Sequence, residues 1–406
     1  MKKTYFWQTA LMAGALLFGF TACSNDDNEA QQQNNNEERT LVIALGSSNA
    51  GSMRTTQFST APTTTAENTI SSVTIGVFNG ETPIKIKTFN SSSTENGITT
   101  VWDETSSSNI TITMATQGVV NGNTIVAIAN PASTTVTALE NATTLTAFKD
   151  IAIGARTLLT GSNTGTEEIS TGLPMIGHGT IDGGAGTTSD PFKINSGISL
   201  YHMAAKVSIE SYSTEFTGIY AGATFTPTLV YLDNVPEEQK CWYTPSTSTT
   251  YLSGATDAET EYLRSTSTLT STKLGGGSDN IYFYTMPNGN DGTSGKATRL
   301  VVKGEFTPSG GSATTVYYPI YLDYNTADQS AASAADFGAY KSEIASYLTG
   351  GVRKPKLVYP NDWYKIALTI KAVGTTSATG DLDPQAVQVT VSAVDFNGLS
   401  QTATFQ

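Results

Sequence analysis

Thr40-Leu41-Val42-Ile43-Ala44-Leu45 is a short apolar run with the period of a β-strand. Successive side chains of a strand point to opposite faces, so Leu41, Ile43 and Leu45 share one face. Gly46-Ser47-Ser48-Asn49-Ala50-Gly51-Ser52 then ends the run with residues that favour loops. This loop closes at Met53-Arg54-Thr55. The stretch predicts a compact first strand followed by a flexible loop with a basic residue at its end.

Strands of the same texture recur over the rest of the chain. They are predicted over residues 73–77, 84–87, 110–114, 124–129, 203–210, 228–232, 281–284, 300–303, 316–322, 363–372 and 387–391. Residues 124–129 are nearly all apolar and predict a central strand, whereas Pro319 implies an edge or a bulge. The helical spacing of apolar residues predicts one helix over 139–151 and another over 327–348.

Length and composition agree with an all-β protein of more than one domain. The 406 residues have a mass of 42.7 kDa, a length typical of two or three domains. Threonine, a β-branched residue that favours strands, is abundant. The Gly-rich stretch 182–186 marks a loop near a domain boundary. We therefore expect two β-sandwich domains with minor helix, over residues 55–196 and 197–406.

Charge, cysteine and histidine usage exclude several classes of function. The net charge of −13 argues against a nucleic-acid partner, because such proteins carry clustered basic patches. The two cysteines rule out a disulfide scaffold, and the two histidines leave little for a His-rich metal site or a His-based triad. We expect no enzymatic activity, no cofactor and no metal. Cys241 is expected to be a buried or half-buried thiol.

The N-terminus has the order of a lipoprotein signal peptide, residues 1–22. Lys2 and Lys3 precede an apolar run that is too short to span a membrane and that ends at Phe20-Thr21-Ala22-Cys23. This order predicts cleavage before Cys23 and lipidation of that cysteine; the alternative is an ordinary secretory signal with a cysteine at its cleavage site. Residues 25–38 are almost wholly polar and predict a solvated tether.

The order and spacing of these segments resemble the fimbrillins, the major subunits of the type V pili of anaerobic Gram-negative bacteria. The resemblance begins with the signal, the tether, the strand 40–45 and the loop before Arg54, and it covers nearly the whole chain. It continues through Val73-Thr74-Ile75-Gly76-Val77-Phe78-Asn79-Gly80, Ile125-Val126-Ala127-Ile128-Ala129-Asn130, His202-Met203-Ala204-Ala205-Lys206, Tyr317-Tyr318-Pro319, Trp363-Tyr364-Lys365-Ile366-Ala367-Leu368-Thr369-Ile370 and Val394-Asp395-Phe396.

The resemblance implies two tandem transthyretin-like β-sandwich domains in a structural subunit of a surface fimbria with a role in adhesion. The lipid on Cys23 would anchor the precursor in the outer membrane. An arginine-specific, trypsin-like protease would cut between Arg54 and Thr55 and release a propeptide, residues 23–54. Its removable strand consists of Leu41, Val42, Ile43, Ala44 and Leu45. A donor strand from another copy of the chain, or from another fimbrial subunit, would then fill the vacated groove.

The sequence leaves three alternatives. A cut at Arg39 would remove the tether but keep the strand 40–45 in place. The donor strand lies in residues 385–396 or in 400–406, unless these form a closing hairpin of the second sandwich; the apolar residues concerned are Val387, Val389, Val391, Phe396 and Phe405. The other function is that of a monomeric surface lipoprotein that binds glycans through Trp102 or through Trp242-Tyr243.

Overall fold

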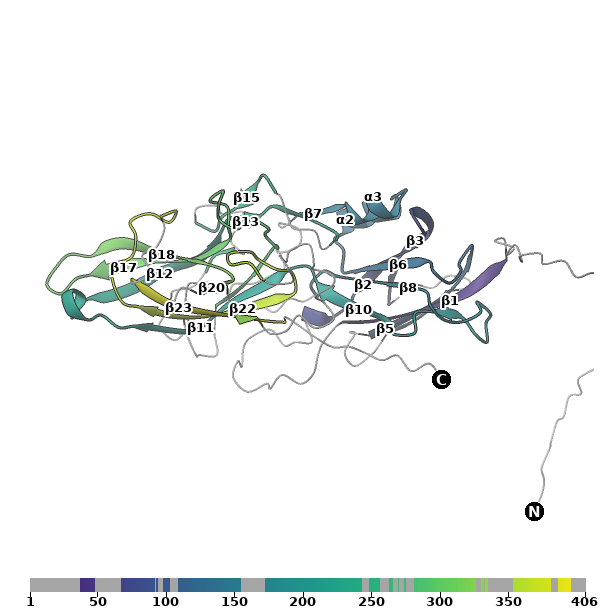
Figure 1. The fold of residues 1–406 in the computed structure, drawn as a ribbon, viewed down its shortest axis with the longest axis horizontal. Coiled ribbons are helices and arrows are strands. Elements are labelled where there is room, and N and C mark those ends of the chain that lie inside the picture. The colour runs from purple at the N-terminus through teal and green to yellow at the C-terminus, as the bar shows by residue number, and fades with distance from the viewer. Residues whose placement is uncertain are drawn as a thin grey trace, which may run out of the picture. The chain divides into compact units, whose positions relative to one another are not determined.

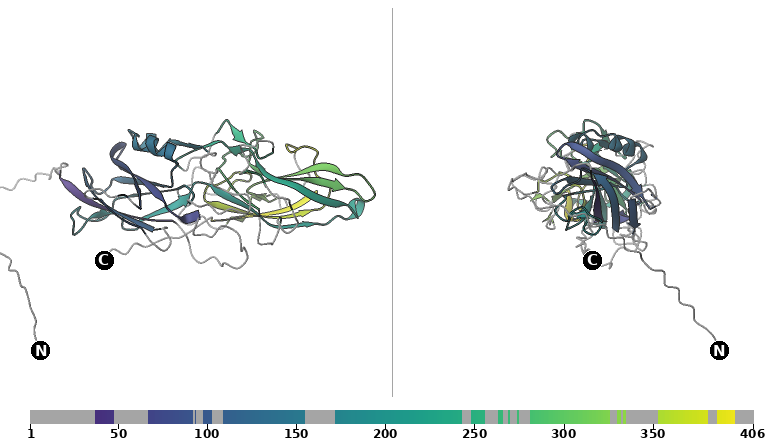
Figure 2. Two further views of the ribbon diagram at one scale, coloured as in Figure 1. Left: turned by 180° about the vertical axis from the view of Figure 1, so that it is seen from behind. Right: turned by 90° about the vertical axis from the view of Figure 1, so that its right-hand side faces the viewer.

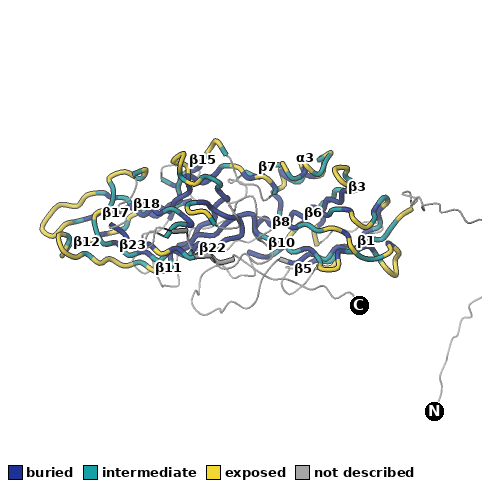
Figure 3. Tube along the Cα trace, viewed as in Figure 1, coloured by how far each residue is buried: buried dark blue, intermediate teal, exposed yellow. Residues whose placement is uncertain are grey.

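The computed structural model is an all-β protein, and two short α-helices lie within its described residues (Figure 1). It describes residues 37–47, 67–91, 93, 98–102, 109–154, 172–242, 248–255, 263–265, 269, 274, 281–325, 330–331, 333–334, 353–380 and 386–395. These residues belong to one compact unit, 36–406. Buried residues follow the strands, and exposed residues gather in the connections (Figure 3).

A nine-stranded sheet comprises most of the N-terminal part. Its strands are β1 (Glu38–Ser47), β2 (Ser72–Asn79), β3 (Thr82–Asn90), β4 (Ile98–Trp102), β5 (Asn109–Gln117), β6 (Thr124–Ala129), β8 (Met175–Thr180), β9 (Phe192–Lys193) and β10 (Ile198–His202). Their order is β3-β2-β6-β8-β10-β1-β5-β4, with β9 paired to β1. As predicted, residues 124–129 form a central strand, because β6 has β2 and β8 as neighbours. Apolar side chains from both halves of the sheet share one core cluster.

The helix predicted over residues 139–151 is wrong as one element, since two helices replace it. They are α2 (Ser133–Glu140) and α3 (Leu145–Lys149). The break follows from capping, because the side chain of Thr144 accepts the backbone N–H of Ala147 and so begins a new helix. Both helices lie beside the strands β2 and β3 (Figure 2), and Phe148 packs edge-on against Phe78 with ring centroids 5.5 Å apart.

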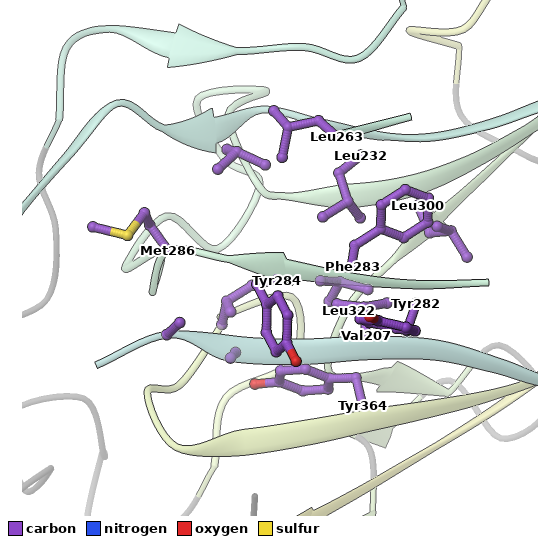
Figure 4. Packing of buried hydrophobic residues seen from close by; sticks show 14 of the residues in the cluster. Val207, Leu232, Leu263, Tyr282, Phe283, Tyr284, Met286, Leu300, Leu322 and Tyr364 are labelled. Carbon is purple, nitrogen blue, oxygen red and sulfur yellow. The ribbon is translucent and has the colours of Figure 1, made fainter. Parts of the chain in front are cut away.

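Two sheets of the C-terminal part supply much of the larger core cluster, which also includes side chains of β2, β6, α2 and α3. One has the order β16-β11-β22-β23-β21 and the other β12-β17-β18. Their bounds are β11 (Ala205–Thr214), β12 (Thr224–Asp233), β16 (Tyr282–Thr285), β17 (Arg299–Thr307), β18 (Thr314–Tyr321), β21 (Ser333–Ala334), β22 (Asp362–Ile370) and β23 (Val387–Asp395). Side chains of both sheets meet in the core, among them Val207, Leu300 and Tyr364 (Figure 4).

Short elements join these sheets. Three ribbons pair β13 (Val235–Pro236) with β15 (Tyr251–Leu252), β14 (Glu238–Lys240) with β7 (Ala152–Gly154), and β19 (Tyr324–Asn325) with β20 (Ser330–Ala331). A 3-10 turn, η1, covers Gly218–Tyr220. The β7–β14 ribbon links a strand that follows α3 to one that follows β12 and β13 in the chain.

Two further predictions concern the C-terminal half. Pro319 lies in β18, the outer strand of its three-stranded sheet, so the predicted edge position is confirmed. The helix predicted over 327–348 falls mostly outside the described residues. It is wrong at residues 330–331 and 333–334, because these pair as β20 with β19 and as β21 with β23. The domain division at residues 196 and 197 stays a prediction.

Candidate functional site

The first strand, β1, lies inside the nine-stranded sheet. On one side it runs antiparallel to β5, from Glu38 opposite Gln117 to Gly46 opposite Asn109. On the other side it runs parallel to β9 at Leu41 and parallel to β10 at Leu45. A strand with partners on both edges leaves two unpaired edges when it is withdrawn.

The apolar face of β1 is part of the core. Leu41, Ile43 and Leu45 are 0%, 1% and 2% exposed, whereas Val42 and Ala44 are half-buried. This agrees with the predicted alternation of faces. Burial of three such side chains contributes roughly 1.5–3 kcal/mol each, or about 5–9 kcal/mol together. The same residues are therefore both a strand of the sheet and the filling of a long apolar groove.

A Gly-rich loop, residues 182–190, holds the N-terminal end of β1. The carbonyl of Gly186 accepts the backbone N–H of Thr40 at 2.9 Å, and the carbonyl of Ala185 accepts Nη1 of Arg39 at 3.4 Å. The carbonyl of Asp190 in turn accepts the N–H groups of Ala185 and Gly186. We call residues 182–190 the clasp.

Sequence reasoning placed the stretch 182–186 at a domain boundary and missed its contact with β1. Gly184 and Gly186 have positive φ angles of 83° and 79°. A side chain at Gly186 would also clash with the ring of Phe192, which pairs with β1 as part of β9. Paired glycines show that a tight turn is required, but no local pattern tells which distant strand the turn meets.

The two arginines considered as cleavage sites differ in what the structure describes. Arg39 lies within β1 opposite Thr116, and its guanidinium is 3.0 Å from the carboxylate of Glu37. Arg54 and Thr55 lie outside the described residues, as does Cys23. Of the two candidate bonds, the one after Arg39 is thus built into a hydrogen-bonded ladder.

The C-terminal candidates divide in the same way. Val387, Val389 and Val391 are buried in β23, which pairs along its length with β22. Phe396 and Phe405 lie outside the described residues. In this state β23 lies between β22 and β21 in the five-stranded sheet, and it belongs to a different sheet from β1.

The aromatic residues considered for glycan binding offer little free surface. The Trp242 ring has the ammonium of Lys149 3.9 Å from its centroid and the His178 ring at 5.0 Å. Such contacts cover an aromatic face on which a sugar would stack. Trp102 is known only by its backbone in β4, and Tyr243 lies outside the described residues.

Other reactive groups are enclosed in the fold. Cys241 is buried, as expected, and burial raises the pKa of its thiol to about 12. Within the described ranges, no cluster of three His, Cys, Asp or Glu residues could hold a metal ion. No helix in that part of the chain has the length and apolar character to cross a bilayer.

A buried charge cluster, which the sequence did not single out, lies in the C-terminal part. The guanidinium of Arg353 contacts the carboxylates of Asp323 at 2.6 Å and of Asp362 at 2.7 Å. All three side chains are buried, and Tyr364 donates to Asp362. The pKa of Asp323 is raised to about 8, chiefly by burial and to a lesser extent by the carboxylate of Asp362, while Arg353 opposes the rise.

Comparisons with known proteins show a similarity to fimbrial subunits. Residues 40–191 match the family model described as major fimbrial subunit protein (FimA). The match begins in β1 and ends one residue before β9, so it spans most of the nine-stranded sheet. No curated protein matches the sequence.

Three solved structures share the fold. The first is a fimbrilin, FimA, from Porphyromonas gingivalis W83, with 15% identity and a TM-score of 0.58; the match covers 90% of this chain and 99% of that one. The second is a candidate cell adhesion protein from Parabacteroides distasonis ATCC 8503, with 16% identity, a TM-score of 0.56 and coverage of 89% of this chain and 100% of that one. The third is a candidate cell adhesion protein from Bacteroides eggerthii DSM 20697, with 17% identity, a TM-score of 0.56 and coverage of 89% of this chain and 98% of that one.

The shared fold and the family model that matches residues 40–191 together support a structural subunit of a pilus. The resemblance to the fimbrillins is thereby confirmed, as is the all-β fold with minor helix.

Proposed function

We propose that this protein is a subunit of a type V fimbria that is exported as a plugged precursor and polymerises by donor-strand exchange. The observation that carries the proposal is the position of β1, an interior strand with three buried apolar side chains. The covalent connection between this strand and the rest of the sheet runs through the chain between Ser47 and Glu67. Lipid on Cys23 would anchor the precursor in the outer membrane, and the finished subunit would serve adhesion.

A cut between Arg54 and Thr55 would convert β1 from a covalent part of the chain into a separate peptide. A tethered strand competes at a high effective concentration, and the cut removes that advantage. The buried face still contributes about 5–9 kcal/mol, so β1 leaves slowly after the cut, and the strand of the next subunit then takes its place. The protease is thus the trigger, and the next subunit completes the step.

The proposal places the cut at Arg54 because Arg39 is protected. A protease binds its substrate as an extended strand with free backbone groups, and the backbone on both sides of Arg39 is paired with β5. The N–H of Thr40, on the leaving side of the bond, is also held by the clasp. Cleavage after Arg39 would first require this end of β1 to separate from the sheet.

We propose the C-terminal segment 387–406 as the donor. A strand that replaces β1 must pair with the vacated edge of β5 and must present three apolar side chains at alternate positions. Val387, Val389 and Val391 have this spacing. Their release from the core of β23 costs about as much as their burial in a groove returns, so the exchange is close to balanced in apolar burial. Phe396 and Phe405 add apolar surface beyond β23.

The alternative, a monomeric glycan-binding lipoprotein, has less support. It requires an accessible aromatic platform, and the ring of Trp242 is already in contact with Lys149 and His178. The two functions also differ in a simple observable, because the glycan-binding protein would stay a monomer after proteolysis.

Limited digestion of the lipid-free precursor with an arginine-specific protease tests the proposal. We expect a new N-terminus at Thr55, followed by filaments in negative-stain micrographs. Arg54→Ala is the control, and its precursor should stay monomeric in size-exclusion chromatography. A clean cut after Arg54 that leaves a monomer after prolonged incubation would contradict donor-strand exchange.

A further inference from the structure

A buried ion pair joins the start of β11 to the chain just before β2. Nζ of Lys206 lies 2.6 Å from Oε1 of Glu67, and the two side chains are 1% and 3% exposed. The hydroxyl of Tyr284 donates to the same carboxylate oxygen. Lys206 also lies over the ring of Trp363, 4.6 Å from its centroid. Desolvation of two charges offsets most of their attraction, so such a pair fixes a geometry more than it adds stability.

Glu67 also meets the end of β10 through its backbone. Its carbonyl accepts the N–H of Leu173 at 3.1 Å and lies 3.2 Å from Nε2 of His202, the last residue of β10. Asn361 completes this contact, because its side-chain oxygen accepts the backbone N–H of His202 at 3.0 Å. Burial lowers the pKa of His202 to about 4, so the imidazole is neutral at ordinary pH.

The strand β10 is shared between two partners. Its first three residues, Ile198, Ser199 and Leu200, pair with β1, whereas Tyr201 and His202 pair with β8. Withdrawal of β1 therefore removes the ladder partner of the first three residues. The strand is then held from its C-terminal end, where His202 contacts Glu67 and Asn361.

Glu67 also lies between the proposed cut and β2 in the chain. The chain that follows it is fastened by Asn130, whose amide donates to the carbonyl of Thr69 at 2.8 Å and accepts the N–H of Ser71 at 2.8 Å. A new N-terminus at Thr55 would thus lead into an anchored segment before β2 begins.

We propose that Glu67 and Lys206 are positioning residues for strand exchange, which hold the groove wall β10 and the new N-terminal segment in place while β1 is absent. This inference rests on the proposed function. Glu67 and Lys206 are far in sequence from the apolar side chains of β1. They act on β10, the strand beside which the donor must lie, through the contact between Glu67 and His202. The groove would then stay ordered between the loss of one strand and the arrival of the next.

The test compares hydrogen exchange of residues 198–202 in the intact lipid-free precursor and in the cleaved chain. The propeptide that ends at Arg54 is first separated from the cleaved chain by size-exclusion chromatography in dilute urea. The main variant is Glu67→Gln, which keeps the shape and removes the charge. Tyr284→Phe serves where Glu67→Gln does not fold, because it removes only the hydroxyl that donates to Glu67. Asp150→Asn is the matched control, since it breaks an exposed ion pair with Lys240.

In the intact precursors, where β1 still pairs with β10, we expect the variants to exchange at the wild-type rate. After cleavage, we expect exchange at residues 198–200 to be at least tenfold faster in Glu67→Gln and Tyr284→Phe than in the wild type. Assembly should slow by a similar factor. Equal protection of β10 in the cleaved wild type, Glu67→Gln and Tyr284→Phe would overturn the inference. Exchange is measured on single subunits, so failure of the wild type to polymerise would count against the proposed function and not against this one.

Discussion

Thr40 in β1 donates its backbone N–H to the carbonyl of Gly186 at 2.9 Å, which ties the first strand of the protein to a loop far along the chain. The hydrogen bond lies at the N-terminal end of β1, next to Arg39. The contact therefore links two properties, the stability of β1 in its groove and the resistance of the bond after Arg39 to proteolysis.

Gly186→Ala should loosen this end of β1. The residue has a φ of 79°, and a methyl group would clash with Phe192, so we expect a loss of roughly 2–4 kcal/mol in the free energy of unfolding. Cleavage after Arg39 should then appear in N-terminal sequencing after limited digestion.

Gly218→Ala is the matched control for that substitution. Its φ of 57° is also positive, but no atom lies within 4 Å of the added methyl group. It should cost only about 1–2 kcal/mol and leave Arg39 uncut. Equal destabilisation by the two variants, with no cleavage after Arg39 in either, would show that the clasp does not protect β1.

Ile43→Ala tests the apolar face of β1. Ile43 is 1% exposed, and removal of a buried side chain of this size costs about 2–5 kcal/mol. Val42→Ala, on the half-buried face, should cost about 1 kcal/mol or less. Urea unfolding of the two precursors measures the difference, and similar midpoints would mean that β1 adds little to the core.

Removal of residues 396–406 tests whether the donor needs more of the chain than β23. The shortened precursor keeps β1 and its groove, so it should fold and be cut at the wild-type rate. Added to growing wild-type filaments, the cleaved product should accept a strand but donate a shorter one, which keeps Val387, Val389 and Val391 and lacks Phe396 and Phe405. It should therefore shorten the filaments as its share rises. Filaments of normal length would limit the donor to β23.

The cluster around Arg353 predicts a pH dependence of stability. The pKa of Asp323 is raised to about 8 in the folded state, so the folded protein holds a proton there that the unfolded chain releases near pH 4. The contribution of Asp323 to stability is thus fully present below about pH 4 and is lost as the pH rises through about 8. The urea concentration at the unfolding midpoint should therefore fall as the pH rises from about 4 to about 8, and Asp323→Asn should remove this part of the fall. An unchanged pH profile in Asp323→Asn would mean that Asp323 is ionised throughout.

Much of the fold follows from local patterns. The alternation in residues 363–370 and the apolar run 124–129 predict strands that the structure contains, because burial on one face or on both leaves a periodic trace in the sequence. The single helix over 139–151 failed for a local reason too, since the capping side chain of Thr144 outweighs a spacing of apolar residues that would suit one long helix.

Long-range contacts could not be predicted in this way. Nothing near Gly186 points to Thr40, and nothing near Glu67 points to Lys206, because each pair meets only when distant segments come together. The first strand was predicted correctly as a strand, but its place between β5 and β10 depends on the topology of the whole sheet. That place is what makes β1 a candidate plug.

A reversible lock on β1 tests the central claim most directly. Ala44 and Thr111 are partners across the β1–β5 ladder, at a separation that suits a disulfide, so Ala44→Cys with Thr111→Cys should join the two strands when oxidised. After cleavage at Arg54, we predict that the oxidised variant stays monomeric and that the addition of reductant starts filament growth at the wild-type rate. Filaments that grow equally well from the oxidised, cleaved variant would contradict the account, because β1 would then not need to leave.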